Sequence, residues 1–240
     1  MPRLDVLVTR SGLVESRERA QALILAGRVR VAGETVRRPD RSVSEDAQIA
    51  VDAEPAYASR GALKLGPALD GFGVDPSARV CADIGASTGG FTDVLLRRGA
   101  AKVYAIDVGR GLLHWRLRQD PRVVVIERVN ARDLEALPEP VSLVVIDVSF
   151  ISLDKVLPAV RRVASDAEVV ALFKPQFEVG RAEVGKGGIV RSPEAVRSAL
   201  ARFREWCAAN DYAVIDEAPS EVTGAEGNQE FFLHLRPGAR

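Results

Sequence analysis

From residue 79 to the end of the chain, short apolar runs alternate with amphipathic stretches, and this alternation limits the fold more than any other feature. The predicted strands are 79–85, 101–107, 122–127, 141–148 and 167–174, and the predicted helices are 89–99, 110–119, 152–164 and 192–210. Strands that alternate with helices indicate a mostly parallel sheet covered by helices on both faces. Two last runs, 212–220 and 229–236, have no helix between them and predict an antiparallel edge. The class is therefore α/β, with a Rossmann-like sheet of seven strands.

The first 52 residues predict a small separate α+β domain. A helix is expected from Leu4 and ends near Gly12, and Ser16 is the expected N-cap of a second helix over 17–26 that ends at Gly27. Residues 28–36 alternate Arg and Val around a turn and predict a hairpin. We expect a domain at 1–52, a linker at 53–58, where Pro55 interrupts any helix, and a larger domain at 59–240. A helix over 59–73, capped by Ser59, opens the larger domain.

Basic residues are concentrated in this N-terminal part. The formal net charge of the 240 residues is zero, yet residues 1–42 contain nine Arg, no Lys and five acidic residues. A basic module on a neutral chain indicates a surface that binds RNA or DNA, and a solvated basic face is the alternative. The candidate RNA-binding residues are Arg3, Arg17, Arg19, Arg28, Arg30 and Arg60.

A glycine-rich loop joins the first predicted strand of the sheet to the first helix. Its spacing is G-x-x-x-G-G rather than the G-x-G-x-x-G of dinucleotide-binding proteins, and Asp107 ends the next strand 22 residues after Gly85. An acid at that position binds the hydroxyls of a ribose. A nucleoside cofactor without a phosphate, such as S-adenosylmethionine, fits this pattern. The candidate cofactor-binding residues are Asp83, Gly85, Ser87, Thr88, Gly89, Gly90, Phe91, Asp107, Asn130 and Asp147.

A second glycine-rich segment, GRAEVGKGG, has the Gly-Lys spacing of a phosphate-binding P-loop. That motif requires Ser or Thr after the Lys to hold magnesium, and Gly187 stands there. We therefore predict a mobile active-site loop, in which Gly180, Gly185, Gly187 and Gly188 act as hinges.

Lys174 is unusual because it ends an apolar strand in a chain that has 28 Arg and only five Lys. Lys can lose its proton when it is buried, whereas Arg stays charged. Asp147 ends the neighbouring strand, Glu230 begins the last strand, and Lys64 lies on the helix before the sheet. If these strands share one sheet, the four side chains converge at its carboxyl edge, beside the glycine loop. The candidate catalytic residues are Lys64, Asp147, Lys174 and Glu230.

Both parts of the chain resemble known families. The strings RLDVLV, SRERAQALI and GRVRVAGETV resemble the S4 RNA-binding domain. Residues 59–240 resemble the RrmJ/FtsJ-type methyltransferases, through SRGALKL, VVIDVSF, LFKPQFE and GNQEFFL. The whole chain resembles the TlyA (hemolysin A) family of ribosomal RNA methyltransferases, although Tyr57-Ala58 stands where members often have Trp-Val.

The resemblance implies a sheet of the methyltransferase type, S-adenosylmethionine as cofactor, and the Lys-Asp-Lys-Glu tetrad of ribose 2'-O-methylation. Burial or a neighbouring cation such as Lys64 can lower the pKa of a lysine, so we expect Lys174 to be the base. Lys64 and Asp147 are then orienting and electrostatic groups, and Glu230 is a carboxylate that positions the substrate. The implied substrate is a cytidine of 23S ribosomal RNA within a ribosomal subunit, with 16S RNA as a second candidate. We also expect a monomer.

Other classes of protein are disfavoured by composition. Cys81 and Cys207 form no CxxC pair, and two His residues exclude a three-histidine metal site, so no metal is expected. The absence of a signal peptide and of a spanning segment predicts a cytoplasmic protein that does not enter membranes. The alternatives are a non-catalytic ribosome-binding factor, a pore-forming hemolysin and an NAD-dependent oxidoreductase.

Overall fold

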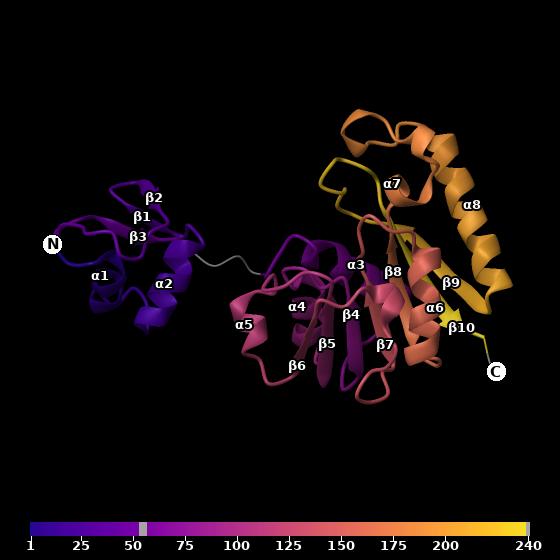
Figure 1. The fold of residues 1–240 in the computed structure, drawn as a ribbon, viewed down its shortest axis with the longest axis horizontal. Helices are drawn as coiled ribbons and strands as arrows, with labels where there is room; N and C mark the ends of the chain where they lie inside the picture. The colour runs from indigo at the N-terminus through magenta and orange to yellow at the C-terminus, as the bar shows by residue number, and fades with distance from the viewer. Residues whose placement is uncertain (53–56, 239–240) are drawn as a thin grey trace. The chain divides into compact units, whose positions relative to one another are not determined.

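The computed structural model describes residues 1–52 and 57–238, and the chain divides into two compact units, Met1–Ala56 and Tyr57–Arg240 (Figure 1). Residues 53–56 of the predicted linker lie outside the described residues. Among the described residues, no helix is both long and apolar enough to cross a membrane.

The N-terminal unit contains two helices and a three-stranded antiparallel sheet with the order β2-β1-β3. Its elements are α1 (Leu4–Arg10), α2 (Arg17–Leu25), β1 (Val29–Val31), β2 (Glu34–Val36) and β3 (Ile49–Val51). Ser16 caps α2 as predicted, because its hydroxyl accepts a hydrogen bond from the backbone N–H of Arg19 at 3.2 Å. The first helix ends at Arg10, close to the predicted end near Gly12, and Gly12 lies in the left-handed region, at φ +72°.

The C-terminal unit contains the predicted sheet of seven strands, in the order β6-β5-β4-β7-β8-β10-β9. The strands are β4 (Val80–Ile84), β5 (Lys102–Asp107), β6 (Val123–Glu127), β7 (Leu143–Ile146), β8 (Glu168–Phe173), β9 (Tyr212–Pro219) and β10 (Phe231–Pro237). Strands β4 to β8 pair in parallel, while β10 is antiparallel to both β8 and β9. The α/β class and the antiparallel edge are therefore confirmed.

Helices accompany these strands along the chain (Figure 1). They are α3 (Ala62–Phe72), α4 (Gly90–Arg97), α5 (Trp115–Arg118), α6 (Leu153–Val163), α7 (Pro175–Glu178) and α8 (Pro193–Ala209), with short 3-10 turns η1 (Ala131–Asp133), η2 (Arg181–Glu183) and η3 (Lys186–Gly188). Successive residues of a strand pack into hydrophobic clusters on opposite faces of the sheet. Val169 and Ala171 of β8 pack in the cluster that includes α6 and α8, whereas Val170 and Leu172 pack in the cluster that includes α3 and α4. This alternation explains why the strands read as continuous apolar runs.

Two local predictions are wrong. Ser59 does not cap the helix that follows it: α3 begins at Ala62 with Gly61 at the N-cap position, and the Ser59 hydroxyl accepts from the backbone N–H of Gly61 at 3.3 Å. The helix predicted over 110–119 is a single turn, α5, whose cap is His114. Gly111 precedes it at φ +69°, a conformation that interrupts a helix.

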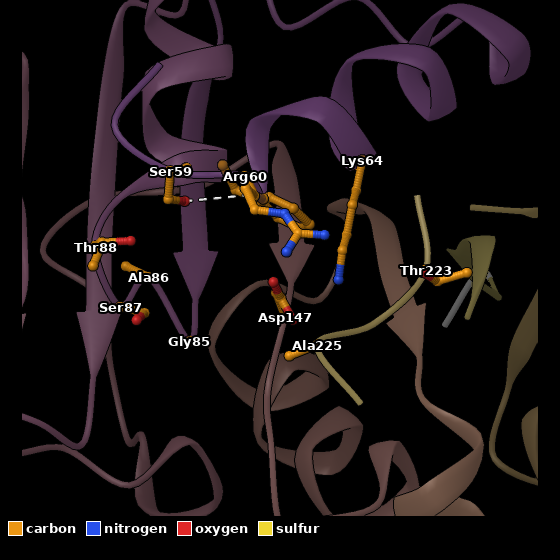
Figure 2. A pocket seen from close by; sticks show the side chains of 13 residues that line it. Ser59, Arg60, Lys64, Gly85, Ala86, Ser87, Thr88, Asp147, Thr223 and Ala225 are labelled. Carbon is orange, nitrogen blue, oxygen red and sulfur yellow. Dashed lines mark hydrogen bonds between the residues drawn. The ribbon is translucent and has the colours of Figure 1, made fainter. Parts of the chain in front are cut away.

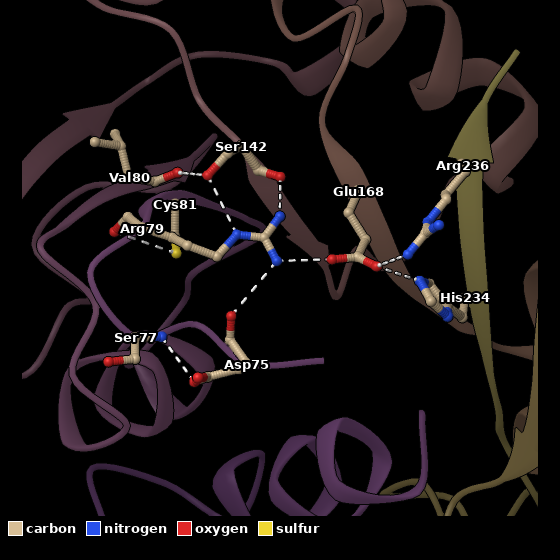
Figure 3. Close-up of polar contacts among 9 residues, drawn as sticks. All are labelled: Asp75, Ser77, Arg79, Val80, Cys81, Ser142, Glu168, His234 and Arg236. Atoms are coloured by element: carbon tan, nitrogen blue, oxygen red, sulfur yellow. Dashed lines mark hydrogen bonds and ion pairs between the residues drawn. The ribbon is translucent and has the colours of Figure 1, made fainter. Parts of the chain in front are cut away.

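A cluster of charged side chains closes the amino end of the parallel strands (Figure 3). The carboxylate of Glu168 accepts from Arg79 at 2.7 Å, contacts the ring Nε2 of His234 at 2.7 Å and accepts from Arg236 at 3.2 Å. Arg79 also donates to the hydroxyl and to the backbone carbonyl of Ser142, which precedes β7. We call Arg79, Glu168, His234 and Arg236 the amino-end cluster, and it joins β4, β8 and β10.

The order of the strands also locates the ligand crevice. From β4 the chain moves outward to β5 and β6, and it then returns to the other side of β4 with β7. In open α/β sheets, ligands bind at the carboxyl ends of the strands where the order reverses in this way. The reversal lies between β4 and β7, whose last residues precede Gly85 and Asp147.

Candidate active site

The loop after β4 passes close to the end of β7, and only glycine fits at its first position. Gly85 has φ +87°, and a Cβ there would overlap the backbone carbonyl of Asp147. Gly89 has φ +95° and is the N-cap of α4, while a Cβ on Gly90 would overlap the Ser59 hydroxyl. The glycines therefore let three segments, from β4, β7 and the start of α3, meet backbone to backbone.

Asp83 supports this loop from below. One of its carboxylate oxygens accepts from the backbone N–H of Thr92 at 2.8 Å and from the Thr92 hydroxyl at 2.6 Å. The side chain is fully buried, and burial raises the pKa of Asp83 to about 7, although the bonds from Thr92 oppose the shift. Asp83 and Gly89, both predicted to bind cofactor, line neither cavity described below.

A cavity of about 580 Å³ lies beyond the carboxyl ends of β5 and β7. Asp107 is fixed in its wall, because its two oxygens accept from the backbone N–H groups of Ser87 at 2.8 Å and Gly109 at 2.7 Å. Its apolar walls include Val108, Leu112, Val129, Phe150 and Ile151, none of which was predicted from the sequence. The polar side is supplied by Gly85, Ser87, Asp107, Asn130, Arg132, Asp147 and Ser149. An apolar cavity with a few fixed polar groups suits a nucleoside.

A smaller cavity, of about 220 Å³, adjoins the first along Gly85, Ser87 and Asp147 (Figure 2). Its lining also contains the predicted residues Thr88, Gly90, Phe91 and Lys64. Figure 2 shows Arg60 and Lys64 extending from the start of α3 toward Asp147, with Thr223 and Ala225 on the opposite wall. Arg60, predicted to bind RNA, thus lies in the C-terminal unit, beside the glycine loop.

The two cavities together fit the predicted cofactor. S-adenosylmethionine joins an adenosine, whose flat base packs well against apolar walls, to a charged amino-acid tail. The larger cavity is the more apolar, and the smaller one is lined by hydroxyl, amine and guanidinium groups. The backbone cradle at Gly85, which a side chain would fill, lies where the cavities join.

The four predicted catalytic residues come together as two ion pairs. Lys174 Nζ lies 2.6 Å from Asp147 Oδ1, and Lys64 Nζ lies 2.6 Å from Glu230 Oε2. The side chain of Lys64 is 13% exposed and that of Glu230 only 2%, so the second pair is the more deeply buried. Asp147 directly follows β7, Lys174 directly follows β8, and Glu230 directly precedes β10. Lys64 projects from α3 toward the same edge of the sheet, so the four side chains meet there.

The two pairs also influence each other. Burial raises the pKa of Glu230, while Lys64 and, more weakly, Lys174 oppose the shift and Asp147 adds to it. Lys174 has a further partner that the sequence did not indicate: its amine donates to the hydroxyl of Ser149 at 3.0 Å. With two amines and two carboxylates, the site is an alternating charge cluster rather than an isolated buried charge.

The glycine-rich segment 180–191 follows α7 and is not the strand-to-helix loop that a P-loop requires. Gly187 and Gly188 have φ +78° and +77°. Asn228, which is 3% exposed, accepts from the Val190 N–H at 2.9 Å and donates to the Gly188 carbonyl at 2.8 Å. These bonds tie the segment to the residues that precede Glu230, and its predicted hinge motion stays a prediction.

In the N-terminal unit, a fully buried acid organises the predicted RNA-binding arginines. Asp5 accepts from Arg3 at 3.0 Å, Arg17 at 3.0 Å and Gln21 at 2.7 Å. Burial alone would raise the pKa of Asp5, but these hydrogen bonds outweigh burial and lower it. The side chains of Arg3 and Arg17 remain 47% and 49% exposed, so they are held in place and still reach solvent.

The other predicted arginines of this unit are distributed around the same elements. Arg30 pairs with Asp52 at 3.1 Å, Arg28 is partly buried just before β1, and Arg19 lies in the first turn of α2.

Comparison with known proteins places each unit in a family. Residues 57–237 match the model of the FtsJ-like methyltransferase family, and residues 2–49 match that of the S4 domain. A Mycobacterium tuberculosis protein named 16S/23S rRNA (cytidine-2'-O)-methyltransferase TlyA is 51% identical over 98% of this chain and 89% of its own length. A Bacillus subtilis protein named putative rRNA methyltransferase YqxC is 44% identical over 98% and 86%, and hemolysin A of Brachyspira hyodysenteriae is 41% identical over 97% and 99%.

A solved structure described as a putative hemolysin from Streptococcus thermophilus has 41% identity and a TM-score of 0.74, and the match covers 98% of this chain and 88% of that one. A putative S-adenosylmethionine-dependent methyltransferase from Listeria monocytogenes, at 14% identity and a TM-score of 0.55, shares the fold over 76% of this chain and the whole of that one. The protein is therefore a member of the FtsJ-like methyltransferase family that carries an N-terminal S4 domain, and it belongs with the TlyA proteins.

Proposed function

We propose that this protein transfers a methyl group from S-adenosylmethionine to the ribose 2'-oxygen of a cytidine in ribosomal RNA. The observation that carries the proposal is the two ion pairs, Lys174 with Asp147 and Lys64 with Glu230. Asp147 lines both cavities and Lys64 lines the smaller one, while Lys174 and Glu230 line neither and contact these two residues from behind. The names of the Mycobacterium tuberculosis and Bacillus subtilis relatives support the class of substrate. The Mycobacterium tuberculosis name includes both 16S and 23S RNA, and we keep 23S RNA as the first candidate substrate and 16S RNA as the second.

The residues that would hold the cofactor divide between the cavities. Asp107, already fixed by two backbone N–H groups, would bind the ribose hydroxyls, and Asn130 with the apolar walls would hold the base. Ser87, Thr88 and Gly85 would contact the amino-acid part. When bound, the cofactor supplies a methyl group already activated by its sulfonium charge.

Because the methyl donor is activated, the protein has to position the ribose and remove its hydroxyl proton. We assign Lys174 as the base, since a neutral amine accepts a proton and the Asp147 carboxylate beside it holds it in place. Glu230 would position the ribose, and Lys64 in turn fixes Glu230. The proton moves from the 2'-oxygen to Lys174 Nζ while the oxygen takes the methyl group.

The S4 domain would hold the RNA through exposed arginines. Arg3 and Arg17 present guanidinium groups that Asp5 has already oriented, and phosphate oxygens are their natural partners. A substrate inside a ribosomal subunit, action as a monomer and a cytoplasmic location belong to this proposal. A non-catalytic factor would not need the tetrad, and nothing in the described residues favours a pore-forming protein or an NAD-dependent enzyme.

The direct test is to incubate the purified protein and S-adenosylmethionine with ribosomal subunits from a strain that lacks the enzyme, and to map new 2'-O-methyl groups. We expect new 2'-O-methylcytidine in 23S RNA, and small subunits examined in parallel show whether 16S RNA is modified. Calorimetry with S-adenosylhomocysteine and with NAD separates this function from an oxidoreductase. No new methyl group on either subunit, with S-adenosylhomocysteine bound, would refute the substrate but not the cofactor.

A further inference from the structure

The amine of Lys174 has two oxygen partners rather than one. Asp147 Oδ1 lies 2.6 Å from its nitrogen, and the hydroxyl of Ser149 lies 3.0 Å from it. A neutral amine has two N–H groups and one lone pair arranged tetrahedrally, and a protonated amine has three N–H groups. Asp147 contacts the amine as an ion pair, and among the described residues the Ser149 hydroxyl is the acceptor that forms a hydrogen bond with it. These two contacts leave one apex of the nitrogen for a third group.

The ion pair with Asp147 alone would not fix where that apex points, because the Asp147 oxygen forms no hydrogen bond that sets the rotation about the last C–N bond of Lys174. The hydrogen bond to the Ser149 hydroxyl restricts this rotation. A base must face the proton that it accepts, so its orientation matters as much as its basicity.

The segment that carries Ser149 is joined to the segment that carries Lys174. The Ser149 segment leads to Ser152, whose hydroxyl donates to Glu178 at 2.6 Å, and to Leu153, whose backbone N–H donates to the same carboxylate at 2.8 Å. Glu178 lies on α7, which begins immediately after Lys174. The rings of Phe150 and Phe177, 5.3 Å apart, form another contact between the two segments. The segments that carry Ser149 and Lys174 are thus joined independently of any ligand.

We propose that Ser149 is a positioning residue of the methyl-transfer site. It accepts an N–H of the Lys174 amine beside the ion pair with Asp147, and this bond turns the remaining apex of the nitrogen toward the ribose hydroxyl. After transfer, the proton taken from the 2'-oxygen occupies that apex, the oxygen–methyl bond has formed, and the sulfur–methyl bond has broken with its electron pair left on sulfur. This inference rests on the proposed function and adds a fifth polar group to the four recognised from the sequence.

The test compares Ser149→Ala and Ser149→Thr with the unchanged full-length protein. We expect Ser149→Ala to lower the single-turnover rate on saturating ribosomal subunits by about tenfold, the scale of one well-placed hydrogen bond. The affinities for S-adenosylhomocysteine and for the subunits should be unchanged, because the hydroxyl acts through Lys174. Ser149→Thr keeps a hydroxyl and should restore most of the rate. Ser198→Ala, on α8 and outside both cavities, is the matched control.

Each other result contradicts the inference. A Ser149→Ala rate within twofold of the unchanged protein would show that Asp147 alone orients the amine. A parallel loss of S-adenosylhomocysteine affinity would assign the hydroxyl to the cofactor cavity. A slow Ser149→Thr variant with an unchanged melting temperature would show that the size of the side chain, not its hydroxyl, sets the rate. If the unchanged protein binds S-adenosylhomocysteine but methylates neither subunit, the proposed function fails first and this inference with it.

Discussion

The two ends of the parallel sheet hold charge in different ways. At the carboxyl end, two lysines and two carboxylates form separate pairs, Lys174 with Asp147 and Lys64 with Glu230. At the amino end, a single carboxylate, Glu168, accepts from two guanidiniums and contacts an imidazole (Figure 3). The chain has five Lys among 33 basic residues, so two of its few lysines are at the carboxyl end while arginines are used at the amino end.

The opposite pKa shifts of the two glutamates show what the difference means. Burial raises the pKa of Glu230, and its partner Lys64 does not cancel that effect. Burial acts on Glu168 in the same direction, but hydrogen bonds from Arg79, His234 and Arg236 outweigh it and lower the pKa. The amino-end cluster therefore stabilises its charge, whereas the carboxyl end holds a carboxylate at some cost to stability. Lysines suit the second arrangement because they can exchange a proton, which arginines cannot.

The largest effect should come from removing the amine of Lys174. Lys174→Ala should lower methyl transfer by about 10²–10⁴-fold, the contribution typical of a general base, and Lys174→Arg should not restore it because a guanidinium stays protonated. Single-turnover methylation of ribosomal subunits measures the rate, and calorimetry with S-adenosylhomocysteine should show unchanged binding. Lys155→Ala, which removes an exposed lysine paired with Asp154, is the control. An active Lys174→Arg would show that the site needs only positive charge there.

The next largest effect should be on the free energy of unfolding, in which Glu168→Gln and Glu230→Gln should differ. Glu168→Gln should lower the free energy of unfolding at neutral pH by about 2 kcal/mol, because two arginines lose an ionised partner that is mostly buried. Its methyl-transfer rate should stay unchanged, since the amino-end cluster lies at the other end of the sheet. Glu230→Gln keeps an oxygen that can accept from Lys64 and removes a carboxylate whose ionisation is disfavoured, so its unfolding free energy should stay level or rise.

The two glutamates should change the free energy of unfolding with pH in opposite directions. Glu168 has a lowered pKa in the folded protein, so its stabilising contribution is present above the unfolded value of about 4.3 and is lost as pH falls through the lowered folded value. Glu230 has a raised pKa, so its contribution is complete below about 4.3 and is lost as pH rises through the raised value. Denaturant unfolding between pH 3 and pH 8 should show the difference from each Gln variant changing in opposite directions. Parallel changes would mean that the two ends are electrostatically alike.

The sequence predicted the carboxyl end of the sheet far better than the amino end. Asp147 and Lys174 follow adjacent parallel strands directly, so the strand pattern alone brings them to one edge. Glu168 meets His234 and Arg236 only because β10 runs antiparallel to β8, with His234 opposite Val170. That register depends on packing between segments more than 60 residues apart, and single-sequence patterns do not contain it.

Local errors have equally specific causes. Ser59 has the residue type of a helix cap, but a glycine at position 61 occupies the capping position and the serine faces Gly90 instead. Ser149 gave no signal because a serine after a strand is common, and its role depends on a contact with a side chain 25 residues away. At the carboxyl end of the sheet the charged residues were recognisable from the sequence, whereas the Ser149 hydroxyl beside them was not.

The S4 domain provides the test with the smallest expected effect. In it, Asp5 lies between Arg3 and Arg17, and this repeats the arrangement of the amino-end cluster, in which one mostly buried acid lies among arginines. Here the arginines are about half exposed, and we expect them to bind phosphate as well as to hold the fold. Arg17→Ala with Arg19→Ala should weaken ribosomal RNA binding severalfold and reduce the slope of log affinity against log salt by about 1–2. Filter binding at several salt concentrations measures both, and S-adenosylhomocysteine affinity should not change. An unchanged salt slope with a lowered melting temperature would make this acid-centred cluster structural only, as at the amino end of the sheet.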